Sequence, residues 1–207
     1  MKDLLLYVAD ADALAFMRSI LRKHQALGIR QIAVDIERHP LRDSGMVQSG
    51  AQLTRMKKGL YHKALLMWDH HGSGRDHKQA PVAVQDEIQR DLDAYTWKDN
   101  SAVIILVPEL EQWIWYCESA LLNHCGITSE QLQGFVDAYA RKMSKSPDEL
   151  KAEQPKELFE YVLRDRLKRT ISPRDFEEIG SRAGIQGLIA CDSFQAIVDR
   201  LRAWFPL

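Results

Sequence analysis

The sequence predicts an α/β fold, built on a parallel sheet of about four strands and followed by a helical C-terminal extension. Four short apolar runs occur in the first half of the chain, and each is followed by a segment with helical spacing of apolar residues. After residue 109 no further strand pattern occurs, and helical patterns continue to the end. Apolar strands that alternate with helices are typical of parallel sheets covered on both faces, because each parallel connection needs a crossover.

The expected strands are residues 4–9, 31–36, 64–68 and 102–107. Helices are expected at residues 10–25, 51–60 and 82–97. In the first of these helices Ala13, Phe16 and Ile20 recur at intervals of three or four residues, and Gly28 ends the pattern. This βα alternation predicts a Rossmann-like core.

The second half of the chain is expected to be all helix. The predicted helices are residues 109–122, 129–142, 156–168, 173–183 and 193–204. Ser172 precedes Pro173, which is a typical helix start. Serines and prolines among charges make residues 142–156 the expected mobile connector. We therefore expect an α/β core at residues 1–118 and a helical extension at 119–207, packed on that core.

The composition excludes several classes of protein. Of 207 residues, 45% are hydrophobic and 28% are charged, which is typical of a globular chain rather than a disordered one. The net charge of −1 provides no overall positive field for nucleic acid. Three scattered cysteines argue against a disulfide framework or a zinc ribbon and favour the cytoplasm. No apolar run reaches the length of a signal peptide core or a membrane span, so no membrane association is expected.

Acidic residues follow three of the four expected strands. Asp10 and Asp12 follow the first strand, Asp69 the third, and Glu109 and Glu111 the fourth. Because the carboxyl ends of parallel strands meet at one edge of the sheet, we expect these groups to gather there. Clustered carboxylates repel one another unless a cation compensates, and hard oxygen ligands suit Mg²⁺ or Mn²⁺. An acid after a strand is also a common helix cap, so for Asp10 and Asp12 both interpretations stay open.

The expected metal ligands are Asp10, Asp69 and Glu111, with Asp12 as a further candidate behind them. If a helix begins at Pro108, the carboxylate of Glu111 lies in its first turn, at the edge of the sheet and beside exposed backbone N–H groups. Glu109 is then expected to cap that helix. Leu110, Trp113, Ile114 and Cys117 recur at helical spacing, which is typical of a stripe that faces the core, and Trp113 and Trp115 are expected to pack there.

The segment after the third strand carries histidines and a Gly-Ser-Gly-Arg sequence. His71, or its neighbour His70, is the expected general base or an additional ligand. Ser73 and Arg75, together with Arg42 from the loop after the second strand, are expected to hold a phosphate. A zinc site on the histidines is the alternative, but such sites normally use i, i+4 spacing on a helix. The glycines are equally consistent with a flexible surface turn, and no Walker loop is present.

Three motifs resemble those of a known family. They are HPLRDSG at 39–45, DHHGSGR at 69–75 and PELEQW at 108–113. They are similar to motifs of the Toprim-like proteins of bacterial antiphage defence loci, and most closely to a small family found in methylation-associated defence islands. The resemblance covers most of the chain, including residues 155–158 and 193–205.

This resemblance implies a Toprim-type fold in which clustered acids hold Mg²⁺ for the cleavage or rearrangement of a phosphodiester. It also implies a multi-protein defence assembly with an ATPase or methyltransferase partner. Two positions depart from the family pattern. Toprim domains open with a Glu-Gly pair where this chain has Asp10-Ala11, and their Asp-x-Asp becomes Asp69-x-His71 here.

A second resemblance is to the DHH phosphoesterases, which also bind metal. The pattern that starts at Asp10-Ala11-Asp12, together with Asp69-His70-His71, is similar to two of their signatures. That family also carries a histidine shortly before its first pair and a further acidic strand between the signatures. This chain has Tyr7 before Asp10 and no such intervening aspartate.

Two functional hypotheses follow from the sequence. The first is an Mg²⁺-dependent enzyme of the nuclease type, which cleaves phosphodiesters in an antiphage defence system. The second is a noncatalytic, degenerate Toprim subunit that binds other defence proteins. The neutral net charge favours the second hypothesis, or else an enzyme to which a partner delivers nucleic acid.

Overall fold

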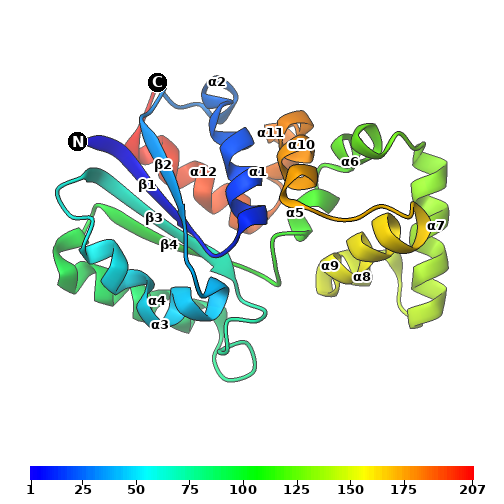
Figure 1. Ribbon diagram of the computed structural model, residues 1–207, viewed down its shortest axis with the longest axis horizontal. Helices are drawn as coiled ribbons and strands as arrows, with labels where there is room; N and C mark the ends of the chain where they lie inside the picture. Colours follow the sequence, from blue (N-terminus) through cyan, green and yellow to red (C-terminus); the bar gives the residue numbers. More distant parts are fainter.

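The computed structural model describes all 207 residues and has a four-stranded parallel sheet at its centre (Figure 1). The strands are β1 (Lys2–Val8), β2 (Val34–Arg38), β3 (Tyr61–Asp69) and β4 (Ser101–Leu106). Their order is β2-β1-β3-β4, and every neighbouring pair is parallel. The predicted α/β class is therefore confirmed. Each observed strand overlaps a predicted one.

Helices from the first half of the chain cover both faces of the sheet. They are α1 (Ala11–Leu21), the short α2 (His24–Leu27), α3 (Arg42–Arg55) and α4 (Pro81–Leu92), which continues into an irregular turn, η1 (Asp93–Trp97). Alternate residues of β1 face different cores: Leu4 and Leu6 pack with α1, whereas Leu5 and Tyr7 pack with α3 and α4. The apolar runs are continuous because both faces of each strand are buried.

The second half of the chain is helical, as predicted. Its elements are α5 (Gln112–Trp115), α6 (Glu118–Cys125), α7 (Ser129–Met143), α8 (Pro147–Glu153), α9 (Pro155–Glu160), η2 (Tyr161–Arg166), α10 (Pro173–Arg182), α11 (Ile185–Leu188) and α12 (Asp192–Trp204). Helix α10 packs along α1 and α12 packs against β4, while α7 and α8 lie farther from the sheet (Figure 1). The larger core runs across residue 118, and the division there stays a prediction. None of these helices has the length and apolar character needed to cross a membrane.

Two tryptophans of α5 join the sheet to the C-terminal helices. Trp113 is fully buried, and its ring contacts Phe16 of α1 and Phe194 of α12 at centroid distances of 5.6 and 5.1 Å. Trp115 donates from Nε1 to the carbonyl of Pro155, 3.0 Å away, at the start of α9. The expected packing role of both residues is confirmed. These contacts also fix the loop before α5 relative to α9, which is where the candidate site lies.

Helix α3 begins nine residues before the predicted start at residue 51. Glycines and serines hide it in the sequence, because both are poor helix formers. Gly45 is required there by packing. A Cβ atom at this position would lie 2.2 Å from Nδ1 of the buried His39, so only glycine lets the helix pass the ring.

Two other segments differ from the prediction. The expected connector at 142–156 contains helix α8, whose start is capped by reciprocal hydrogen bonds between Ser146 and Glu149. The single helix expected at 109–122 is instead two helices, because the backbone leaves the helical conformation at Cys117. The shorter α5 leaves residues 107–111 free to form a loop.

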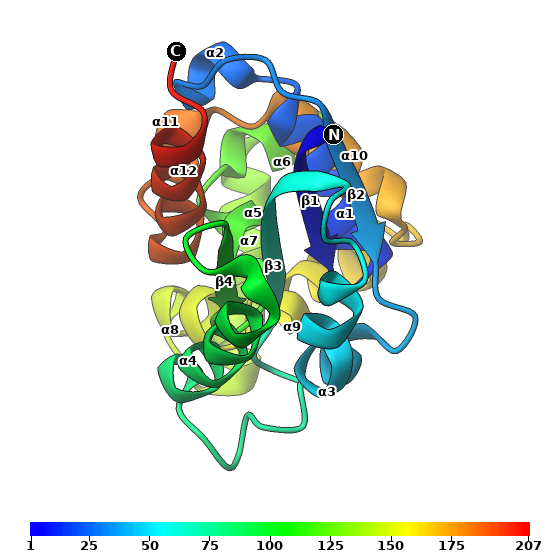
Figure 2. The same cartoon turned by 90° about the vertical axis from the view of Figure 1, so that its left-hand side faces the viewer.

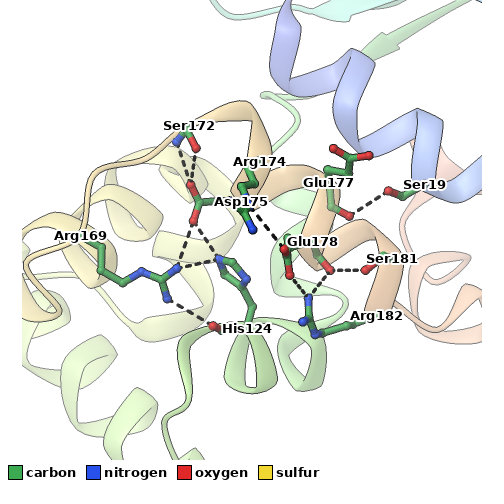
Figure 3. Close-up of polar contacts among 10 residues, drawn as sticks. All are labelled: Ser19, His124, Arg169, Ser172, Arg174, Asp175, Glu177, Glu178, Ser181 and Arg182. Atoms are coloured by element: carbon green, nitrogen blue, oxygen red, sulfur yellow. Dashed lines mark hydrogen bonds and ion pairs between the residues drawn. The ribbon is translucent and has the colours of Figure 1, made fainter.

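A buried polar network holds the start of α10 against α6 (Figure 3). The Asp175 carboxylate accepts hydrogen bonds from the backbone N–H and the hydroxyl of Ser172, each 2.9 Å long. Its other oxygen lies 2.8 Å from His124 Nε2 and 3.4 Å from the Arg169 guanidinium. Burial alone would raise the pKa of Asp175, but the hydrogen bonds from His124 and Ser172 outweigh it and hold this pKa below its usual value.

Replacing Asp175 with asparagine is expected to destabilise the fold by about 3 kcal/mol at pH 7, because it breaks a buried, hydrogen-bonded ion pair. The pKa of this carboxyl is lower in the folded chain, so its contribution is complete above the unfolded value of 3.8 and is lost as the pH falls below it. Urea unfolding of wild type and variant at pH 7 and pH 3 measures both effects. Glu177→Gln on the same helix, whose carboxylate forms no ion pair, is the control and should change stability little (Figure 3). A constant difference between wild type and Asp175→Asn at both pH values would contradict this account.

Candidate metal centre

The carboxyl ends of the four strands point to the same edge of the sheet, near α9 (Figure 1). Each strand delivers at least one acid there. Asp10 follows β1, Asp43 lies in the first turn of α3 after β2, Asp69 ends β3, and Glu109 and Glu111 follow β4. A parallel sheet therefore gathers five carboxylates that lie far apart in the sequence.

Three of these acids form the centre of the cluster. One carboxylate oxygen each of Asp69, Glu109 and Glu111 lies within 4.8 Å of the other two. Glu109 and Glu111 are only 4% and 6% exposed. Asp69 also fixes the loop that carries them, because its Oδ1 accepts a hydrogen bond of 2.9 Å from the N–H of Leu110. The geometry of the triad thus depends on one strand end and one loop.

Asp10 and Asp43 flank this triad. Asp10 caps α1, since its Oδ1 accepts hydrogen bonds from the N–H groups of Asp12 and Ala13 at 3.1 and 2.9 Å. Asp43 accepts one from the N–H of Asp69 at 3.0 Å. The charges of both residues raise the pKa of Asp69, so both are close neighbours. Asp10 therefore caps α1 and also lies beside the cluster.

The acids are destabilised in their charged form. Burial raises the pKa of Asp69 well above its usual value, and the charges of Asp43 and Glu111 raise it further. Burial likewise raises the pKa of Glu111 to about 8 and, together with the charge of Asp10, that of Asp12 to about 6. The pKa values of Glu109 and Asp43 are also raised, mainly by burial. Such a set of buried like charges lacks sufficient compensation from the protein.

Lys156 lies in the first turn of α9, and its positive charge lowers the pKa values of most of these acids. Burial lowers its pKa, but the charges of Glu111, Glu109 and Asp69 outweigh burial and raise it. Its backbone N–H also donates to Oε1 of Glu109 over 3.2 Å. The sequence predicts that Glu109 caps the helix that follows it. This prediction is wrong, because its carboxylate binds the N–H of Lys156 instead. Glu109 thus contacts α9 and belongs to the triad.

The donor set fits a hard divalent cation. All three atoms of the triad are carboxylate oxygens, and none of the three cysteines belongs to it. Oxygen donors of this kind suit Mg²⁺ or Mn²⁺ rather than zinc. His71, which is half exposed, has its Nδ1 3.6 Å from Oε2 of Glu109. The histidines of the 70–77 segment thus provide no joint zinc site with these acids.

Three other predicted residues surround this centre. Asp12 is half buried in the first turn of α1. Arg42, with a left-handed φ of 52°, begins α3, and its charge lowers the pKa of Asp12. His70 is 9% exposed, and its Nδ1 has no hydrogen-bond partner.

Two of the three predicted phosphate ligands are occupied by other contacts. The hydroxyl of Ser73 is buried and accepts from the N–H of Arg75 over 3.2 Å. The guanidinium of Arg75 pairs with Glu87, 3.3 Å away, and with Gln79. The structure therefore does not bring Arg75 to the acids.

Sequence reasoning missed the parts played by Asp43, Glu109 and Lys156. The sequence does show Asp43 as an acid after the second strand, which was the one strand end without a predicted metal ligand. Lys156 had no comparable signal, because its position depends on how α9 docks against Trp115.

Comparison with protein-family models, with curated proteins and with solved structures gives no match.

Proposed function

We propose that this chain is a metal-dependent phosphodiesterase of the nuclease type, with Mg²⁺ or Mn²⁺ held by Asp69, Glu109 and Glu111. The observation that carries the proposal is the convergence of these three carboxylates, Asp69 partly buried and the two glutamates buried, within 4.8 Å at the carboxyl ends of the strands. This is the place where open parallel sheets bind their ligands.

The energetic cost of this cluster supports a functional reason for it. Buried carboxylates with raised pKa values destabilise the folded chain, and apolar residues of similar size would pack there without that cost. A fold that keeps such groups at a ligand-binding edge has the stability trade-off typical of an active site. A bound divalent cation would remove the repulsion among them.

When bound, the metal would activate water and neutralise charge on the phosphate. The chain's own residues would supply positioning and proton transfer. Nδ1 of His71 faces Glu109, which leaves Nε2 as the ring nitrogen that accepts a proton from the attacking water. The carboxylate of Glu109 stabilises the imidazolium that results. Arg42 would keep its predicted role and Lys156 would take that of Arg75 in holding phosphate oxygens, because the charges of both act on acids of this edge.

The cellular role that we propose follows the sequence resemblance. The chain would act in the cytoplasm as a component of a bacterial antiphage defence system, together with an ATPase or methyltransferase protein. The net charge of −1 supports delivery of nucleic acid by such a partner rather than independent binding.

A noncatalytic interaction subunit is the second candidate. Two observations favour it: Asp10 is used as a helix cap, and His71 stands where the family pattern has a second aspartate. In this case the acids would hold a structural cation, or none, and the chain would act through its binding surfaces.

The first test is calorimetric titration of the purified chain with Mg²⁺ and Mn²⁺, followed by incubation with single- and double-stranded DNA and RNA. We expect binding by the wild type and metal-dependent cleavage. Asp69→Asn should lower the metal affinity at least tenfold and cleavage at least a hundredfold, because it removes one charged ligand of three.

Glu153→Gln, an exposed acid of α8, is the matched control and should behave like the wild type. Metal binding without cleavage of any substrate, alone or with partner proteins, would support the noncatalytic subunit. Absence of binding at millimolar metal would overturn both forms of the metal proposal.

A further inference from the structure

Strand β4 forms one edge of the sheet. It pairs with β3 alone, and the N–H groups of Ala64 and His70 donate to the carbonyls of Asn100 and Leu106. Hydrogen bonds of a parallel ladder recur at every second residue, so the even-numbered residues of β4 face β3. The N–H and C=O groups of Val103 and Ile105 therefore point to the free edge, and neither residue has a hydrogen bond outside the sheet.

The sequence of this edge lacks the residues that usually protect an edge strand, and the strand is instead flanked by α4 and α12, so that each of its residues is at most 9% exposed. Proteins normally protect edge strands with charges, prolines or bulges. The opposite edge, β2, follows this rule: its sequence is VDIER, and Asp35 and Glu37 form ion pairs with Lys2 and Lys57. In contrast, β4 has the sequence SAVIIL, with no charge and no proline.

A groove runs along the free edge of β4 and is lined by residues of α4 and α12. Figure 2 shows these two helices on either side of the strand. The groove consists of two adjoining hollows of about 500 and 690 Å³, which share Ile104 and Ala196. Ala196 and Ala203 line the α12 side. A further strand would lie about 4.8 Å from β4, beside these small side chains.

The two ends of the groove differ in chemistry. At the Leu106 end, Val82, Val107 and Tyr116 are 62%, 46% and 40% exposed, which is a cluster of large apolar side chains left in water. At the Ser101 end the groove is lined by four aspartates, Asp86, Asp93, Asp99 and Asp199. None of these aspartates forms an ion pair, and Arg200 is the one basic residue of the lining.

We propose that β4 accepts an extended segment of a partner protein as a fifth strand, with lysine or arginine side chains over the four aspartates and apolar side chains beside Val82, Val107 and Tyr116. Main-chain hydrogen bonds to Val103 and Ile105 would provide affinity, and the two ends of the groove would provide specificity. The proposal uses no residue of the metal centre and is independent of the proposed activity.

The charge pattern decides among possible occupants. Nucleic acid is excluded by the aspartates, which repel phosphates. A second copy that paired through β4 in the antiparallel direction would place the acidic end of each chain against the apolar end of the other, so neither acidic end would gain a cation. A basic, extended segment of a different protein is the occupant that satisfies both ends.

The test uses blocked eight-residue peptides that alternate valine and threonine and carry two lysines at one end, in both sequence directions. Binding is measured by fluorescence anisotropy, and amide exchange is measured by NMR. In the free protein the amides of Val103 and Ile105 should exchange faster than those of Ala102 and Ile104. A bound peptide should slow their exchange at least tenfold.

Two variants distinguish specific docking from nonspecific binding. Asp86→Lys combined with Asp199→Lys should weaken the lysine peptide at least tenfold and favour a peptide with glutamates in place of the lysines. Val103→Pro should abolish binding, since it removes an outward N–H while the ladder to β3 uses the even-numbered residues. Asp148→Lys, on the distant α8, is the control for charge and should leave affinity unchanged.

Three results would overturn the proposal. The first is no binding of either peptide at millimolar concentration. The second is an affinity for the lysine peptide that the charge-reversing double variant does not change, or that a backbone-methylated peptide matches. The third is a dimer in sedimentation that Val103→Pro converts to a monomer, which would assign the edge to a second copy of this chain. Because none of these measurements involves metal or cleavage, their failure is separable from failure of the proposed function.

Discussion

Replacing Glu111 with glutamine is expected to make the metal-free protein more stable and the metal-loaded protein inactive. Burial raises the pKa of Glu111 to about 8, so at neutral pH the folded chain keeps this group protonated against its usual preference. Glutamine has a similar shape and no charge to desolvate. We expect a gain of about 2 kcal/mol at pH 8, which for a chain of this size corresponds to about 4–8 °C in Tm.

The same substitution removes one of three charged ligands. Saturating Mg²⁺ should raise the Tm of the wild type, because a ligand that binds only the folded state stabilises it, by about 2.7 kcal/mol at a hundred times its Kd. Glu111→Gln should lose most of this rise, together with cleavage. Differential scanning fluorimetry with EDTA or with 10 mM Mg²⁺ measures both changes.

The opposite signs of these two effects distinguish a functional acid from a structural one. Neutralising a carboxylate kept for the fold would destabilise the chain, as we expect for Asp175→Asn because of its buried hydrogen bonds. Glu153→Gln on the surface of α8 serves as the control, with no expected change in either condition. A fall in metal-free stability on neutralising Glu111 would mean that its charge is compensated in the fold, and the metal centre would lose its main argument.

The strand ends were the part of this site that the sequence could predict. Apolar runs locate the strands, and parallel pairing brings their carboxyl ends together, whatever the intervening sequence. The positions of Asp69 and Glu111 side by side follow from that rule alone. The separate roles of Glu109 and Glu111 did not follow, because they depend on whether α5 begins at Pro108 or, as observed, at Gln112.

Contacts between distant helices could not be predicted in this way. Periodicity indicates that residues 156–168 are helical, but not that the start of α9 docks against Trp115 and brings Lys156 to the acids. Arg75 shows the opposite error. Its position near Asp69 in the sequence suggests a phosphate ligand. In the structure, however, its guanidinium pairs with Glu87 of α4 and donates to Gln79 of the preceding loop. Such choices are decided by side-chain packing, which a single sequence does not contain.

Stability of the metal-free wild type is expected to fall as the pH rises from 5 to 9. Burial raises the pKa of Glu111 to about 8 and that of Asp12 to about 6, and it raises the pKa of Asp69 in the same direction. Between the usual carboxyl values and these raised ones the folded chain binds more protons than the unfolded chain. The free energy of unfolding therefore decreases with increasing pH across this window.

The expected loss is on the order of 3 kcal/mol between pH 5.5 and pH 8.5, after allowance for the partial exposure of Asp12. Urea unfolding at intervals of half a pH unit, in EDTA, measures the slope. Glu111→Gln should flatten the curve between about pH 6 and pH 8, where the folded wild type still holds a proton that the unfolded chain has lost. Asp175 does not contribute, because its pKa is lowered and it titrates below the whole range.

Magnesium should cancel this slope. Metal binds the ionised carboxylates, so its affinity increases as protons leave the site, and this gain offsets the loss of stability of the metal-free chain. Two curves that diverge with pH, one in EDTA and one in Mg²⁺, would identify the titrating groups as the metal ligands. Two parallel falling curves would show that the acids titrate without binding metal. Since the slope of the metal-free curve depends on burial and on repulsion among the acids, and the divergence depends on coordination, one experiment separates the electrostatics of the cluster from its chemistry.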